Sequence, residues 1–213
     1  MLGKRLWIAV LTVVTMLTAS AGVAQDEKNE VGGTIGRTFI SNQGITNATY
    51  PPIIAYGKGL SFEIEYARHL LVTPVFSVSG EVVLMVDHDQ DINGGVSGHA
   101  VLPQQLSELF VTPAVRLNLF PTTAVSPWVS LGGGFGHTGE SSMLLYGGDN
   151  PGKSTTSGVL EGAFGLDVKV WKKLSMRGEV RDFWSGAPDF PLAPTGNTRQ
   201  HHYFVGGGVF WRF

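Results

Sequence analysis

The stretch Gln200–Phe213, QHHYFVGGGVFWRF, decides the fold class. Counted back in twos from its last residue, one face is apolar or aromatic at almost every position: Phe213, Trp211, Val209, Gly207, Val205 and Tyr203. The other face holds a small, mixed and partly charged set: Arg212, Phe210, Gly208, Gly206, Phe204 and His202. Alternation with period two predicts a β-strand that separates two different environments.

The N-terminal residues predict export. Two basic residues precede an apolar run of about a dozen residues, and small residues follow, in the order of a secretory signal peptide. The run is shorter than the roughly 20 residues that a spanning helix needs. Cleavage is expected after Ala21 or Ala24, and we prefer Ala24 because the mature chain then begins with polar residues. We therefore expect a signal peptide over 1–24 and a single domain over 25–213.

Composition excludes several classes of function. Removal of the two basic residues of the signal peptide leaves thirteen basic and seventeen acidic residues, a net charge of −4. This mildly acidic balance gives no reason to expect nucleic acid as a partner. The chain has no cysteine, so neither a disulfide framework nor a thiolate metal site is available.

Eight segments alternate with period two, each about as long as a tilted membrane strand requires. In the second segment, outward Phe62 and Ile64 alternate with inward Glu63 and Glu65. The eight candidate strands are 30–39, 59–70, 75–87, 108–119, 128–137, 158–170, 174–184 and 201–213. Periodicity alone fits either a soluble sandwich or a membrane barrel.

The connections distinguish these two folds. Short turns near 72–74, 121–126 and 171–173 alternate with long polar loops at 40–58, 88–107, 138–157 and 185–200. Short turns on one side and long loops on the other are typical of outer-membrane barrels. We therefore predict an all-β, eight-stranded antiparallel transmembrane β-barrel, an up-and-down meander with long extracellular loops and short periplasmic turns. Its last strand must pair with the first to close the sheet.

The positions of aromatic and charged residues along the strands are those expected of a membrane barrel. Two aromatic levels, separated by aliphatic residues, resemble interfacial girdles: Phe39, Phe62, Phe135, Trp184 and Tyr203 near the long loops, and Phe76, Phe120, Trp128, Trp171, Trp211 and Phe213 near the short turns. The expected outward charges, Arg37, Arg68 and Asp182, lie near strand ends, where a lipid-facing charge costs little.

The layout resembles a known family. Together with PWVSLGGGFG (127–136), RGEVRDFW (177–184) and the final FWRF, it is similar to small eight-stranded OmpA/OmpX-type barrels, in particular the outer membrane protein beta-barrel domain group. The resemblance implies the cell outer membrane as the location and a monomer. It implies outer-membrane lipid, lipopolysaccharide, periplasmic chaperones and the barrel-assembly machinery as partners. That machinery would read a C-terminal signal at Tyr203, Val205, Val209, Trp211 and Phe213.

The inward charges form the first candidate site. They are Glu63, Glu65, Glu81, Arg116, Glu161, Asp167, Lys169, Arg177, Glu179, Arg181 and Arg212. An eight-stranded barrel is narrow enough for side chains to fill, and charges held inside must be paired or hydrated. The set predicts either a salt-bridged plug or a narrow ion path.

Two further motifs carry residues that suit a metal site or catalysis. Asp89, Asp91 and Asn93, with Asp87 nearby, match the opening of a calcium loop, although Ala100 stands where the bidentate Glu belongs. The alternatives are an acidic surface turn and a weak calcium site. Some eight-stranded barrels are lipid A deacylases that use a His and a Ser, but His137 lacks their compact His-x-Ser spacing.

We therefore expect a non-enzymatic outer-membrane protein with a structural or surface-interaction role through its loops, without catalytic residues and without a cofactor other than weakly bound calcium. A narrow channel for ions or small solutes is the first alternative, and a lipid A-modifying enzyme is the second.

Overall fold

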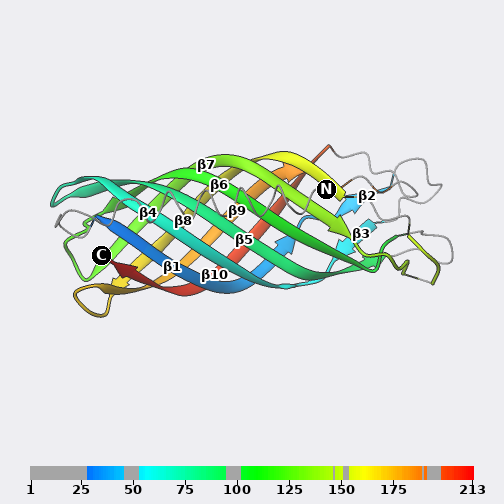
Figure 1. The fold of residues 1–213 in the computed structure, drawn as a ribbon, viewed down its shortest axis with the longest axis horizontal. Coiled ribbons are helices and arrows are strands. Elements are labelled where there is room, and N and C mark those ends of the chain that lie inside the picture. Colours follow the sequence, from blue (N-terminus) through cyan, green and yellow to red (C-terminus); the bar gives the residue numbers. More distant parts are fainter. Residues whose placement is uncertain are drawn as a thin grey trace.

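The computed structural model describes residues 28–45, 53–94, 102–145, 147–150, 154–188, 190 and 198–213. Within them, one antiparallel sheet is formed by β1 (Asn29–Ile40), β2 (Gln43–Gly44), β3 (Ile53–Tyr56), β4 (Leu60–Val72), β5 (Phe76–Gly94), β6 (Gln105–Leu119), β7 (Val125–Glu140), β8 (Ser154–Lys169), β9 (Leu174–Gly186) and β10 (Arg199–Arg212). The eight long strands close into a barrel, and the β2–β3 hairpin adds to the end of β5 (Figure 1). The predicted eight-stranded meander is confirmed.

The C-terminal strand closes the barrel against β1. Their register runs from Glu30 opposite Arg212 to Ile40 opposite His202. The ladder continues to the last residue, because the Asn29 N–H donates to the Phe213 carbonyl at 3.0 Å and the Phe213 N–H donates back at 2.9 Å. The expected pairing of the last strand with the first is therefore confirmed.

The strands extend further than predicted at the long-loop end. β5 continues to Gly94, β6 begins at Gln105, and β7 and β8 lengthen in the same direction. A β-bulge after Asp87 shifts the alternation of β5, so His88 and Asp89 both face outward. Above the apolar part of the wall, the outward residues are polar, so alternation of apolar and polar residues no longer marks the strand.

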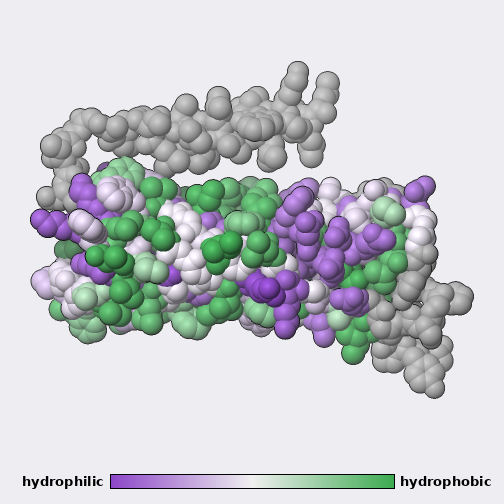
Figure 2. Space-filling view, turned by 90° about the horizontal axis from the view of Figure 1, so that it is seen from below, coloured by the Kyte–Doolittle hydropathy of each residue, from purple (hydrophilic) through white to green (hydrophobic). Residues whose placement is uncertain are grey.

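The two faces of the barrel differ as a membrane strand requires. Large apolar side chains such as Ile64, Leu131 and Phe164 are at least half exposed on the outer face of the barrel. In β1, where glycines obscure the alternation, Glu30 and Thr34 face inward. An apolar wall of this extent is stable against lipid and not against water. Figure 2 shows apolar side chains over much of one side of the barrel, with hydrophilic ones gathered toward the end that carries β2 and β3.

One expected girdle residue is placed differently. The other ten aromatic residues of the two predicted levels are exposed on the outside, but Trp128 is 2% exposed and lies in the lumen. Its position follows from strand phase, because it is in step with inward Ser126 and Ser130. The sequence pattern was misleading because an aromatic ring suits both a membrane interface and a packed barrel interior. None of the described residues forms a helix that is long and apolar enough to cross a membrane.

Candidate functional site

The lumen is filled by four successive layers of side chains. Strand β6 contributes an inward residue to each layer, in the order Arg116, Phe110, Glu108 and Leu106 from the short turns to the long loops. We name the layers, from the short-turn end, the ionic core, the apolar belt, the outer polar layer and the cap. Their composition determines what could enter or cross the barrel.

The ionic core is organised around one carboxylate, Glu65. It accepts hydrogen bonds from Arg116 at 2.5 Å, from Arg177 at 2.8 Å and from Arg181 at 2.6 Å. All three guanidinium groups are fully buried. Two of them come from β9, where inward Glu179 lies between them, and one comes from β6. Glu65 comes from β4, so the core ties together distant parts of the barrel wall.

Each arginine also holds other carboxylates. Glu30 accepts from Arg116 at 2.7 Å and from Arg177 at 2.8 Å. The remaining partners are Asp167 for Arg177, Glu81 for Arg116, and Glu63, Glu81, Glu161 and Glu179 for Arg181. Charge-assisted hydrogen bonds of this kind offset the large cost of burying the charged groups.

Aromatic rings complete the ionic core. The guanidinium carbons of Arg116, Arg177 and Arg181 lie 5.7, 5.0 and 5.4 Å from the Trp128 ring centre. The guanidinium carbon of Arg177 also lies 3.7 Å from the centre of the Phe210 ring. Cations above aromatic faces are stabilised by the ring quadrupole, most strongly where water is excluded.

The structure brings together most of the predicted lumen residues, with two differences. Lys169 is exposed, and its Nζ donates to the Pro121 carbonyl at 2.7 Å at the short-turn rim, so its assignment to the inward network is corrected. Glu30, by contrast, is a buried member that the sequence interpretation missed. It also accepts a hydrogen bond from Arg212 Nε at 2.8 Å. The poor alternation of β1 concealed it, although it is the one acidic residue of the predicted first strand.

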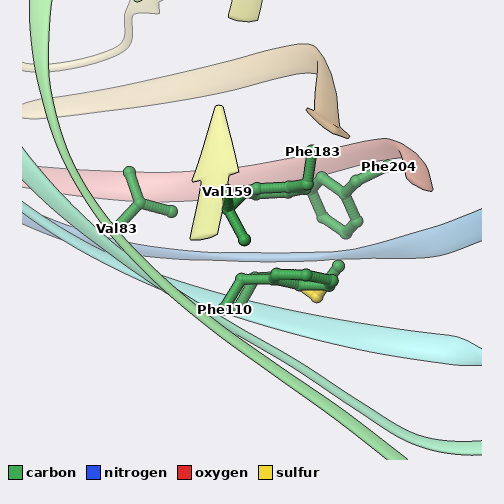
Figure 3. Packing of buried hydrophobic residues seen from close by; sticks show 6 residues of the cluster. Val83, Phe110, Val159, Phe183 and Phe204 are labelled. Atoms are coloured by element: carbon green, nitrogen blue, oxygen red, sulfur yellow. The ribbon is translucent and has the colours of Figure 1, made fainter. Parts of the chain in front are cut away.

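The apolar belt crosses the lumen above the ionic core. The Phe110 and Phe183 rings stack with centres 5.0 Å apart and planes inclined by 10°. Figure 3 shows these rings with Val83, Val159 and Phe204, which project into the interior from different strands. Met85 completes the cluster. The belt residues come from β5, β6, β8, β9 and β10, whereas β1 and β4 present polar residues to the lumen: Thr34, Thr38, Ser61 and Glu63.

The outer polar layer contains an acid–histidine–serine chain. His202 Nδ1 lies 2.9 Å from a carboxylate oxygen of Glu108, and its Nε2 lies 2.9 Å from the Ser185 hydroxyl. All three residues are at most 2% exposed. Sequence spacing could not reveal them, because they belong to β6, β9 and β10. Buried Asp87 lies in the same layer, opposite Glu108 in the β5–β6 ladder.

The cap closes the long-loop end. Its buried residues come from β3, β5, β6 and the adjacent connections: Ile54, Ile92, Leu102, Leu106 and Phe190. Tyr56 packs against it, and desolvation of the hydroxyl holds the pKa of Tyr56 above its ordinary value. The phenol therefore remains neutral at physiological pH.

The predicted calcium motif lies on a strand. Because β5 continues through Gly94, the loop expected from residue 88 is corrected to a strand extension. Asp87 points into the lumen, whereas Asp89, Asp91 and Asn93 face outward. Among the described residues, the aspartates of this motif form no group with metal-ligand spacing.

A different trio has suitable spacing for a metal. Ligand atoms of Glu63, Glu65 and Glu179 lie within 4.8 Å of one another, the one such group that we find in the described part of the chain. Arg181 already lies 3.0, 2.6 and 3.1 Å from these carboxylates. The guanidinium supplies the positive charge that a metal would bring, so the site fits an arginine better than an ion.

The remaining candidate, His137, has an ordinary surface environment. Its Nδ1 lies 2.8 Å from the Thr156 hydroxyl on the neighbouring strand β8. Neither a serine nor a carboxylate is hydrogen bonded to its ring among the interactions of the described residues.

A closed antiparallel barrel with an apolar outer wall and a charged, packed lumen defines a transmembrane β-barrel protein. Residues 9–213 match the model of the outer membrane protein beta-barrel domain, and the chain belongs to this family. No curated protein matches the chain in sequence.

Solved structures agree on the fold. Neisserial surface protein A is 11% identical, covers 87% of this chain and 97% of its own, and superimposes with a TM-score of 0.55. OprG from Pseudomonas aeruginosa is 12% identical, covers 89% of this chain and 97% of its own, with a TM-score of 0.55. At these identities the similarity establishes the architecture alone.

Proposed function

We propose that this protein is a non-conducting, non-enzymatic scaffold of the outer membrane whose long-loop end is an interaction surface. The packing of the lumen carries the proposal, because buried ion-paired arginines and the apolar belt fill it with side chains. In this role the segment 1–24 is a cleaved signal peptide, the barrel acts as a monomer, and no cofactor is required.

The ionic core supports a closed lumen. An ion that crosses the barrel would have to displace guanidinium groups, each of which holds two or more carboxylates. It would then meet the stacked rings of Phe110 and Phe183, which line one side of the lumen with apolar surface. Moving an unpaired charge into so apolar a region is very costly.

The long-loop end supports an interaction role. β5 to β8 are each 15 to 19 residues long, whereas β1, β4, β9 and β10 have 12 to 14. The hairpin β2–β3 and the cap brace the taller side of the barrel. This arrangement presents loops on a rigid, elevated platform, as binding loops commonly require.

The serine–histidine pair does not favour an enzyme. A nucleophile must be reachable by its substrate, and Ser185 is 1% exposed between the belt and the cap. The hydroxyl also lies 3.1 Å from the Gly186 carbonyl oxygen, to which it can donate. The Glu108 carboxylate, although 2.9 Å from His202 Nδ1, accepts no well-aligned hydrogen bond from the described residues, so it does not orient the ring as a catalytic acid does.

Two measurements test the proposal. Purified protein in planar bilayers is expected to give no steady openings, and stable unitary conductance would favour the channel alternative.

Lipid A from cells with and without the protein is expected to be identical, and a change in its acylation would favour the enzyme alternative.

The interaction role needs its own assay. Cells that display the wild type are compared with cells in which a short Gly-Ser turn replaces the β2–β3 hairpin. We expect weaker attachment of the variant to a protein-coated surface. The fraction of barrel that migrates fast on an unheated gel serves as the assembly control. Equal attachment of well-assembled wild type and variant would overturn the interaction role.

A further inference from the structure

A hollow of about 470 Å³ lies on the outer wall of the barrel over β4, β1 and β10. It is lined by Ile35, Gly36, Arg37, Phe39, Leu60 and Val205, and we call it the β1 groove. Arg37 lies opposite Leu60 on one side and opposite Val205 on the other. The groove is therefore apolar in all but one of its side chains, and it is widely open to the membrane rather than enclosed.

The one charged side chain of the groove has no ion-pair partner among the residues that the structure describes. Arg37 is exposed on the lipid-facing wall, and the described residues place no carboxylate in an ion pair with it. The outward carboxylate of Asp182, two strands away, is already held by His201 at 2.8 Å. A guanidinium near this end of the wall reaches the head-group region, where an anionic lipid group offers it an ion pair.

A second cation lies at the long-loop rim of the groove. Lys58 Nζ is 5.5 Å from the centre of the Phe39 ring. Since β1 runs toward the long loops, Phe39 and Lys58 lie beyond Arg37, and Ile35 lies closer to the membrane centre. The groove thus has positive charge at its outer end and apolar side chains below. Figure 2 shows hydrophilic side chains gathered toward that end of the barrel.

We propose that the β1 groove is a binding site for lipid A, the phosphorylated, multiply acylated lipid of the outer leaflet. One acyl chain lies in the hollow against Ile35, Leu60 and Val205, and a phosphate is held by Arg37 and Lys58. Arginine forms paired hydrogen bonds with phosphate, and lysine adds a point charge. The charge pattern selects lipid A over zwitterionic lipid, and the position near the long loops selects the outer leaflet. The site does not depend on the proposed surface role.

Native mass spectrometry of the full-length chain, released from detergent micelles, tests this site. Lipid A, phosphatidylglycerol and phosphatidylcholine are titrated separately onto the wild type. We expect retained lipid A adducts at concentrations at which phosphatidylcholine gives none, and weaker binding of phosphatidylglycerol. Equal retention of lipid A and phosphatidylcholine, or preferential retention of phosphatidylglycerol, would overturn the proposal.

Substitutions locate the binding in the groove. The double variant Arg37→Gln/Lys58→Gln is expected to bind lipid A about tenfold or more weakly, since it loses charge-assisted hydrogen bonds. Arg68→Gln/Lys172→Gln is the matched control, because it also removes two exposed cations, both at the short-turn end of the barrel. Its affinity should equal that of the wild type. Equal loss in both variants would indicate adsorption by net charge and overturn the site.

Filling the hollow provides a test that leaves both charges in place. Leu60→Trp is expected to reduce lipid A binding severalfold by occupying the space of the acyl chain. Arg37→Lys should retain most of the binding, and it keeps the test decisive if the double variant does not assemble. Unchanged affinity in assembled Leu60→Trp protein would contradict the placement of the acyl chain.

Discussion

Phe110 and Phe183 stack across the barrel interior, with ring centres 5.0 Å apart. The strands that carry them, β6 and β9, are separated by two others in the barrel wall, so the contact spans the lumen. Below it lie the arginines of the ionic core, and above it lie Glu108 and His202. The barrel therefore carries charge at two levels, with apolar rings between them on one side of the lumen and polar Ser61 and Glu63 of β4 on the other.

Removal of both rings should open the lumen. In Phe110→Ala/Phe183→Ala, water can occupy the space between the two polar layers, because that space then borders polar groups. We expect brief openings in planar bilayers that the wild type lacks. Phe135→Ala/Phe164→Ala removes two lipid-facing rings instead and should stay silent. A silent Phe110/Phe183 variant would show that the ionic core alone closes the barrel.

Arg181 should be essential for stability. Arg181→Ala leaves Glu63, Glu65 and Glu161 without their shared cation, and loss of one partner of a buried pair costs about 3–5 kcal/mol. Urea unfolding in lipid vesicles measures the free energy of unfolding. Arg68→Ala, at an exposed position, should change it by about 0.5 kcal/mol or less. A loss below about 1 kcal/mol for Arg181→Ala would contradict the assigned role.

Gly134 should not tolerate a side chain. A Cβ atom there would overlap the Val111 carbonyl on the neighbouring strand, so Gly134→Ala requires the backbone to move. Overpacking of this kind costs about 1–3 kcal/mol. At Gly178, no atom lies within 4 Å of the added Cβ, so Gly178→Ala is the control. Equal unfolding midpoints in urea for these two variants would refute the close approach of β6 and β7.

Ser185 should resist nucleophile-directed reagents. Although His202 lies 2.9 Å from its hydroxyl, the belt and the cap exclude the reagent. Folded protein treated with a fluorophosphonate probe should show no adduct on Ser185 by mass spectrometry. Stoichiometric labelling that is lost in His202→Ala would instead reveal an accessible catalytic serine.

The last residue should matter for assembly more than other rim aromatics. Phe213 extends the β1–β10 ladder through two backbone hydrogen bonds and is 49% exposed. Its deletion should reduce the fraction that migrates fast on an unheated gel of cell envelopes. Phe76→Ala alters a comparable exposed ring at the same end and should have a smaller effect. Equal fractions would argue against Phe213 as part of the assembly signal.

Much of the lumen could be predicted from strand phase. Period-two alternation placed Glu65, Arg177 and Arg181 inside the barrel, where the structure has them. Lys169 was assigned inward by the same rule, but at the rim its long side chain is exposed and reaches the Pro121 carbonyl. Alternation is reliable within the membrane, where the two faces have different solvents, and it fails where both faces meet water.

Side-chain alternation determined that the chain forms strands with two different faces, because it reports the environment of each strand directly. The alternation of short turns with long loops then indicated a membrane barrel that Gln200–Phe213 closes. Only the tertiary structure decided which groups meet. Trp128 covers three arginines, and His202 joins Glu108 to Ser185, although these residues lie on four different strands. Such contacts depend on register and curvature around a closed sheet, and these are properties of all eight strands together.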